Sequence, residues 1–332
     1  MPERSPMTPS FGAHTTTDEL LEGLDLSGMR VFVTGVSSGL GLETARAAAA
    51  HGADVVGTAR DLDKARVALE PCADLAIEVV ECDLAALASV RACADALTSL
   101  GAPFDVVVAN AGVMNCPFGR TVDGFETHFG TNHLGHFLLV NRVAPLIRDG
   151  GRVLALTSMA HHTSDVDLDD PGFERTAYVP FRAYGRSKTA NILFAMELDR
   201  RLRRRGVRGI AVQPGGVRTP LLRHTTPEVM QEMMQQVAAH SQRRTDGSHD
   251  DPVPVKTVEQ GAATTAWAAF VAPAAAVGGR YCEDCHVAEV TDAGTAGVRP
   301  YAVDPERARA LWAASEELVG EPFPFAERTP PR

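Results

Sequence analysis

The sequence predicts an α/β protein with a doubly wound parallel sheet, folded as a single domain. Short runs rich in β-branched residues alternate with longer helical stretches along most of the chain. Such alternation is typical of a parallel sheet with helices on both faces. The 332 residues are 45% hydrophobic and show no internal repeat or dividing linker, so they suffice for one large core. Ligands of this architecture bind at the carboxyl ends of the strands, so the residues after each strand are the candidates for chemistry.

The expected elements follow in order from residue 29. Residues 29–34 form a β-branched run that Gly35 stops, and residues 40–50 form an alanine-rich helical run that Gly52 stops. The same alternation then continues. Strands are expected over residues 53–59, 76–82, 104–109, 151–157 and 209–213, with a helix over residues 61–69 and further helical stretches between them.

A polar extension over residues 1–27 precedes the domain, which is expected to span residues 28–332. Two longer excursions, residues 159–183 and 220–256, follow the fifth and sixth predicted strands. Because both leave the sheet at its ligand-binding edge, we expect them to shape the substrate pocket. The second contains an apolar stripe at helical spacing, which we expect to face an apolar substrate as part of a lid: Met230, Met233, Met234 and Val237.

The composition disfavours several classes of partner. The formal net charge of −10 argues against nucleic acid and anionic membranes. No run approaches the ~20 apolar residues that span a bilayer, and the N-terminus lacks the order of a secretory signal, so we expect a cytoplasmic location.

The six scattered cysteines are expected to be free thiols. Cys282 and Cys285 precede His286, but no second ligand pair is present, so no metal site is predicted.

The first predicted strand ends in a glycine-rich turn, TGVSSGLG at residues 34–41. Glycines let the backbone approach a phosphate closely, and the start of the next helix offers N–H groups to a diphosphate. The spacing G-x-x-x-G-x-G differs from the commoner G-x-G-x-x-G. At the first strand-to-helix turn it still indicates nucleotide binding, with these candidate contacts: Gly35, Ser37, Ser38, Gly39, Leu40 and Gly41.

The second predicted strand ends at Ala59-Arg60-Asp61, where the adenosine ribose is expected to bind. An acidic residue there would accept a hydrogen bond from the 2′-hydroxyl of NAD, whereas an arginine pairs with the 2′-phosphate of NADP. Ala59 occupies the place of the acid and Arg60 follows, which favours NADP(H). Asp61 keeps NAD possible, because its carboxylate could neutralise Arg60 or bind the ribose itself.

Later strands are also followed by candidate site residues. They are Asp83 and Leu84 after the third strand, Asn110, Ala111 and Gly112 after the fourth, and Thr157 and Ser158 after the fifth. A tyrosine and a lysine then follow at the spacing Y-x-x-x-K, as Tyr184 and Lys188.

Taken in order, these motifs resemble those of the short-chain dehydrogenase/reductase family. The resemblance covers about residues 28–290, and it implies a Rossmann-like fold and hydride transfer with a nicotinamide cofactor. Finer motifs are similar to the branch of retinol-dehydrogenase-like and WW-domain-containing-oxidoreductase-like enzymes. These are NAGVM at residues 110–114, TNHLGHFLL at 131–139, AYGRSKTAN at 183–191, QPGGVRT at 213–219 and the long insertion between Ser158 and Tyr184.

Tyr184 and Lys188 lie one helical turn apart, so the ammonium would favour the phenolate of a side chain whose usual pKa is near ~10. The resemblance implies that Tyr184 is the general acid and base, that Ser158 hydrogen-bonds the same substrate oxygen, and that Asn132 positions a water beside Lys188. Thr157 competes for the serine role, but the family pattern puts the catalytic hydroxyl second. The resemblance also implies a homodimer, and cofactor contacts from Tyr184, Lys188, Pro214, Gly215, Val217 and Thr219.

We therefore expect an NADP(H)-dependent oxidoreductase that transfers a hydride between the nicotinamide and a carbonyl or alcohol of an apolar small molecule. Two alternatives stay open. One is a nucleotide-sensing binding protein without turnover, against which the complete set of proton-handling residues weighs. The other is a reductase of activated C=C bonds, because a related branch of the family uses the same tyrosine and lysine.

Overall fold

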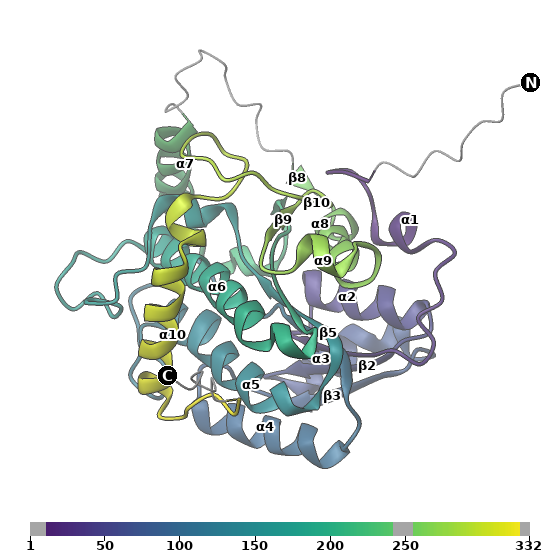
Figure 1. Ribbon diagram of the computed structural model, residues 1–332. Helices are drawn as coiled ribbons and strands as arrows, with labels where there is room; N and C mark the ends of the chain where they lie inside the picture. The colour runs from purple at the N-terminus through teal and green to yellow at the C-terminus, as the bar shows by residue number, and fades with distance from the viewer. Residues whose placement is uncertain (1–10, 242–254, 326–332) are drawn as a thin grey trace, which may run out of the picture.

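The computed structural model describes residues 11–241 and 255–325, and it confirms the doubly wound, Rossmann-like sheet. Eight strands form one sheet (Figure 1). All neighbours in this sheet pair in parallel except the last two, which form a hairpin. From one edge to the other the strands are β3 (Ile77–Glu81), β2 (Asp54–Ala59), β1 (Arg30–Thr34), β4 (Phe104–Ala109), β5 (Ile147–Leu156), β6 (Arg208–Gln213), β9 (Tyr281–Glu283) and β10 (His286–Val287).

Helices cover both faces of the sheet (Figure 1). One face packs against α4 (Leu87–Leu100), α5 (Gly135–Val143), α6 (Pro180–Leu202) and α10 (Pro305–Val319). The other packs against α2 (Gly39–Ala50), α3 (Leu62–Leu69), α8 (Val258–Ala266) and α9 (Ala274–Val277). Outside these layers lie α1 (Thr17–Leu21), α7 (Pro227–Ser241) and the small pair of β7 (Gly216–Val217) with β8 (Val255–Lys256).

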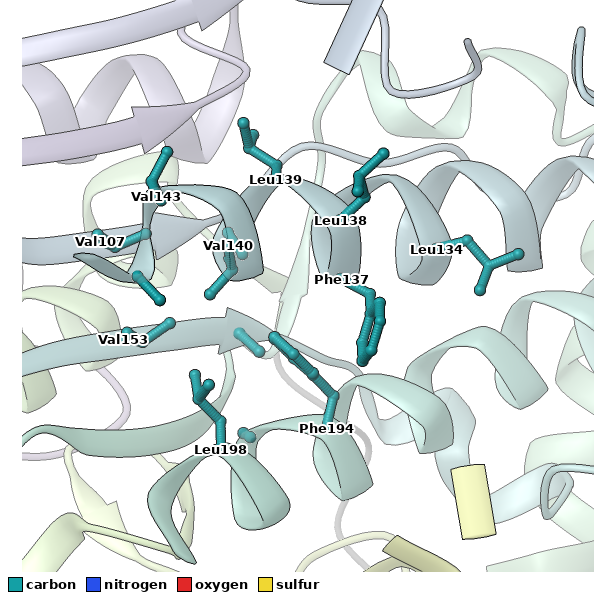
Figure 2. Packing of buried hydrophobic residues seen from close by; sticks show 14 of the residues in the cluster. Val107, Leu134, Phe137, Leu138, Leu139, Val140, Val143, Val153, Phe194 and Leu198 are labelled. Carbon is teal, nitrogen blue, oxygen red and sulfur yellow. The ribbon is translucent and has the colours of Figure 1, made fainter. Parts of the chain in front are cut away.

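The larger core holds α6 firmly against the sheet. Figure 2 shows the rings of Phe137 and Phe194 pointing toward each other between α5 and α6, with centroids 5.8 Å apart. Val107 of β4 and Val153 of β5 belong to the same cluster, and all four side chains are almost fully buried. Burying such a side chain contributes about 1.5–3 kcal/mol. This packing fixes the middle of α6 against β4 and β5.

The predicted strands agree with the structure to within a few residues. The largest difference is at β5, which begins at Ile147 rather than at residue 151, because Ile147 pairs with Phe104 before a register shift. The strands β7 to β10 were not predicted. Each is only two or three residues long, too short for the period-two pattern that identifies a strand.

The predicted extension and excursions are described in part. Within the extension, Leu20 and Leu21 of α1 are buried against Ala47 of α2 and Ala266 of α8. The boundary at residue 27 stays a prediction. The second excursion contains α7 and β8, and its residues 242–254 lie outside the described residues. Of the helices in the described ranges, none has the length and apolar character that crossing a bilayer requires.

Candidate functional site

A cleft of about 400 Å³ opens at the carboxyl ends of β1, β2, β4 and β5. Most of the predicted site residues line it: Gly35, Ser37, Ser38, Gly39, Leu40, Arg60, Asp83, Leu84, Asn110, Ala111, Gly112, Tyr184, Lys188, Pro214 and Thr219. Five other predicted residues are not among the described residues that line it: Gly41, Asn132, Ser158, Gly215 and Val217. Residues that were not predicted also line the cleft, among them Lys64, Val113, Thr131, Leu221 and Arg223.

The glycine turn brings two backbones close together. Gly35 has a φ of +78°, and a Cβ there would lie 2.8 Å from Cβ of Ala111. A Cβ at Gly41 would overlap Nδ2 of Asn110 and the carbonyl of Gly35. Ser38, at the N-cap of α2, makes no side-chain capping bond within the described chain. The side chain of Ser38 thus leaves the first N–H groups of α2 without a cap, as an anion site would require.

Thr34 joins the glycine turn to the segment after β4. Its Oγ1 accepts hydrogen bonds from the backbone N–H groups of Asn110 (2.9 Å) and Ala111 (3.0 Å), and it contacts Nε2 of His136 at 2.9 Å. Nδ1 of His136 donates to the carbonyl of Asn132 (2.9 Å), because a carbonyl oxygen only accepts. Burial lowers the pKa of His136 to about 4, so the ring is neutral and its Nε2 accepts from the Thr34 hydroxyl. His136 could not be identified from the sequence, because its role depends on contacts between distant segments.

Tyr184 and Lys188 lie together at the start of α6. Tyr184 is 4% exposed, and Nζ of Lys188 lies 5.5 Å from the centroid of its ring. Nζ also donates a hydrogen bond to the carbonyl of Leu156 at 3.0 Å. Burial raises the pKa of Tyr184 to about 12, and a hydrogen bond from Ser158 opposes this to a smaller extent. Without a bound cofactor, the phenol of Tyr184 is therefore protonated at neutral pH.

The side chains of Ser158 and Thr157 have different surroundings. Oγ of Ser158 accepts a hydrogen bond from the backbone N–H of Ala160 at 3.1 Å. The same side chain hydrogen-bonds Tyr184. Oγ1 of Thr157 donates to the carbonyl of Lys188 at 2.9 Å, on a side chain that is 2% exposed. Of the two neighbouring hydroxyls, Ser158 is thus the one that contacts the tyrosine.

Asn132 lies in a π-helical turn, Phe129–Leu134, and is fully buried. Its Oδ1 accepts from the backbone N–H of Val113 (2.8 Å), and its Nδ2 donates to the carbonyl of Val113 (2.9 Å) and to Oγ of Ser187 (3.0 Å). A Cβ at Gly112 would lie 3.0 Å from Oδ1 of Asn132 and 3.8 Å from Nζ of Lys188. Asn132 and Lys188 therefore lie on either side of Gly112, and a side chain there would be in tight contact with the amide of Asn132.

The state of Lys188 makes a prediction about stability. Burial lowers its pKa from the usual 10.5 to about 7. Between about pH 7 and pH 10.5 Lys188 is protonated in the unfolded chain but largely deprotonated in the folded one. Its contribution to the unfolding free energy therefore increases as the pH rises through this window and decreases as the pH falls. We expect the unfolding free energy of wild type, relative to Lys188→Met, to increase over this window in urea titrations. If the difference in unfolding free energy between the two proteins stayed constant with pH, it would contradict a lowered pKa for the buried Lys188 amine.

Two cations lie at the end of the cleft next to β2. Arg60 follows the strand, and Lys64 lies one turn into α3 on the same lining. The Asp61 carboxylate accepts a hydrogen bond from the backbone N–H of Lys64 at 2.9 Å, so it caps α3. Lys64 was not predicted, because only the turn of α3 brings it beside Arg60.

Apolar side chains surround the other end of the cleft, next to Tyr184. Met114, Ala160 and Phe181 form a buried cluster with Tyr184, and Met233 of α7 packs against it. Met234 points elsewhere and is 64% exposed. The prediction of one inward stripe is therefore wrong for Met234, since neighbouring helix positions lie about 100° apart. The side chain of Val237 lies outside the described residues.

Residues 29–230 match the family model described as short chain dehydrogenase. The chain is 38% identical over 301 residues to "Short-chain dehydrogenase/reductase prx1" of Penicillium roqueforti, a match that covers 87% of this chain and 85% of the relative. It is 35% identical to the WW domain-containing oxidoreductase of Homo sapiens, covering 94% of this chain and 73% of the relative. It is 34% identical to human Retinol dehydrogenase 11, covering 90% and 88%.

Solved structures share the fold. A crystal structure of an uncharacterized protein from Mycobacterium Paratuberculosis matches with a TM-score of 0.70 and 34% identity, over 94% of this chain and 99% of that one. A short chain dehydrogenase from Burkholderia cenocepacia, solved in complex with NADP, matches with a TM-score of 0.58 and 22% identity, over 79% and 98%. The second likeness is one of fold alone.

Proposed function

Because this chain belongs to the short-chain dehydrogenase/reductase family, in its retinol-dehydrogenase-like branch, we propose that it transfers a hydride between NADP(H) and an apolar carbonyl compound or alcohol. The family makes it an oxidoreductase of CH–OH and C=O groups that uses a nicotinamide cofactor. The observation that carries the finer proposal is the buried pair of Tyr184 and Lys188, which share one cleft with the glycine turn.

The residues of the cleft fit a dinucleotide. The free N–H groups at the start of α2, after Ser38, would hold the diphosphate, and Lys188 would hold the hydroxyls of the nicotinamide ribose. Pro214 and Thr219 also line the cleft, with Thr219 next to Gly39 of the glycine turn, and they would flank the nicotinamide and its phosphates. When bound, the nicotinamide supplies or accepts the hydride.

Tyr184 would handle the proton. Burial keeps its hydroxyl protonated at neutral pH, which is the form that can donate to a carbonyl oxygen during reduction. Lys188 would stabilise the phenolate left behind, and Ser158 would donate a hydrogen bond to the same substrate oxygen. Asn132 fixes Gly112 and Val113 beside Lys188, and we propose that a water held there returns the proton.

The substrate would bind through the apolar cluster beside Tyr184. Met114, Phe181 and Met233 offer carbon and sulfur surface next to the phenol. A flexible thioether adapts to apolar ligands of different shapes. We therefore propose an apolar aldehyde, ketone or alcohol as the substrate class.

Arg60 and Lys64 together favour NADP(H) over NAD(H), and replacing both with alanine tests this. A guanidinium and an ammonium at the ribose would bind the 2′-phosphate, which NADH lacks. The double variant is expected to raise the KM for NADPH about 10- to 100-fold and to leave the KM for NADH almost unchanged. Steady-state kinetics with both cofactors would measure the change.

A matched control is Arg66→Ala on the same helix. Arg66 is 69% exposed and pairs weakly with Asp63 and Glu70, each at 3.9 Å. Its loss should change neither KM. An equal rise in KM for NADPH and NADH in the double variant would mean that Arg60 and Lys64 do not select the 2′-phosphate. A homodimer and a cytoplasmic location stay predictions.

A further inference from the structure

Lys256 of β8 is a buried cation outside the site described above. Its side chain is only 3% exposed, and Nζ forms an ion pair with Asp284. Taking an ammonium out of water is costly, and a buried pair is stable only when each charge keeps its partner. Lys256 is not among the described residues that line the cleft. The burial of Lys256 is therefore not explained by contact with a ligand in the cleft.

The stem of Lys256 packs directly under Gly215. A Cβ at Gly215 would lie 2.8 Å from Cε and 3.0 Å from Cδ of Lys256, and Gly215 has a φ of +91°. The next two residues, Gly216 and Val217, form β7 and pair in parallel with Val255 and Lys256. Any displacement of Lys256 would thus move Gly215 and β7, the segment between Pro214 and Thr219.

The partner carboxylate is held by a strained turn. Asp284 and Cys285 join β9 to β10, with φ values of +47° and +58°. Left-handed backbone is unfavourable for a non-glycine residue, so such a turn persists only when its surroundings hold it. The N–H of Cys285 donates to Oγ1 of Thr264 at 3.3 Å, and Asp284 pairs with Lys256.

A second link joins the same hairpin to Gly215. Glu283 of β9 is buried and contacts Nε2 of Gln213 at 3.5 Å, while Oε1 of Gln213 accepts a hydrogen bond from the N–H of Gly215. Glu283 is itself fixed by the N–H of Gly297 at 2.7 Å. The hairpin of β9 and β10 thus supports Gly215 from two sides.

We propose that Lys256 is a positioning residue for the nicotinamide half of the cofactor, acting through Gly215 and β7. The ion pair with Asp284 fixes the segment between Pro214 and Thr219, and this segment then receives the nicotinamide. The inference rests on the proposed function. The adenosine half binds at Arg60 and Lys64, at the opposite end of the cleft, and does not depend on Lys256.

The two halves of the cofactor can be tested separately by comparing the binding of NADPH with that of 2′,5′-ADP, which carries only the adenosine half. Lys256→Met keeps the stem but removes the charge, and we expect it to raise the Kd for NADPH about tenfold. The Kd for 2′,5′-ADP should stay within about twofold of wild type, because the adenosine end is unchanged. Isothermal titration calorimetry would give both constants.

Asp284→Asn gives an independent variant, since asparagine tolerates the left-handed backbone while losing the charge. It should raise the Kd for NADPH as much as Lys256→Met does. The double variant should bind NADPH no more weakly than either single variant. Lys256→Arg, which keeps the charge, should recover part of the NADPH affinity. Arg30→Met serves as a structural control, because it breaks a 3.0 Å ion pair with Asp54 at the opposite ends of the strands. That variant should lose stability without any change in the NADPH Kd.

Unchanged NADPH affinity in Lys256→Met and Asp284→Asn would overturn the proposal. So would an equal loss of affinity for both ligands, which would point to general unfolding. Failure of wild type to bind either ligand would contradict the proposed function itself, and the inference with it.

Discussion

Tyr184→Phe is expected to lower kcat for carbonyl reduction by about 10²- to 10⁴-fold, the usual contribution of a general acid. The substitution removes only the hydroxyl. The ring keeps its contacts with His128 and Phe181, whose centroids lie 6.2 Å and 6.4 Å away. The Kd for NADPH should therefore stay within about twofold of wild type, since transition-state interactions alone are lost. Single-turnover kinetics and calorimetry would measure the two effects separately.

Tyr178→Phe is the matched control for this substitution. The Tyr178 hydroxyl donates to the carbonyl of Cys116 at 2.8 Å and is not part of the cleft lining. Its loss should reduce stability by about 0.5–1.5 kcal/mol, as for one hydrogen bond, and leave kcat almost unchanged. Turnover by Tyr184→Phe at the rate of wild type would assign the proton to another group.

Gly41→Ala is expected to disrupt the diphosphate site from behind. Gly41 does not line the cleft, but a methyl group there would overlap Nδ2 of Asn110 and the carbonyl of Gly35. The glycine turn and the segment after β4 would have to separate. Overpacking of this kind costs about 1–3 kcal/mol, so we expect the Kd for NADPH to rise about 10- to 100-fold, together with a lower Tm.

The control for this change is Gly12→Ala, where an added Cβ meets nothing within 4 Å. This variant should leave both the Kd and the Tm unchanged. If Gly41→Ala bound NADPH as tightly as wild type, the close approach of the glycine turn and Asn110 would have no role in binding.

The sheet was predictable because its long strands are β-branched runs that end in glycine or polar residues. β1, β2 and β4 illustrate this, and the residues after them line the cleft because parallel strands end at one edge. The hairpin of β9 and β10 could not be predicted. Its strands are too short to show a period, and its turn contains no glycine, since Asp284 and Cys285 adopt the left-handed conformation under tertiary constraint.

The unpredicted site residues depend on contacts between distant segments. Lys64 joins Arg60 only through the turn of α3, and His136 is identified only when Thr34 and Asn132 are seen on either side of its ring. Helical periodicity predicted the apolar stripe of α7, but it could not tell which edge of the stripe faces the protein. The packing of α7 buries part of Met233 and exposes Met234.

Transfer of deuterium from NADPH deuterated at C4 of the nicotinamide tests the central claim most directly. The acceptors would be straight-chain aldehydes, cyclic ketones and an α,β-unsaturated ketone, with the products analysed by mass spectrometry and NMR. We predict that wild type places deuterium on the carbinol carbon of an apolar alcohol and that Tyr184→Phe does not. Deuterium on a carbon of the former double bond would instead identify a C=C reductase. NADPH binding without transfer to any acceptor would contradict the account and favour a nucleotide-sensing protein.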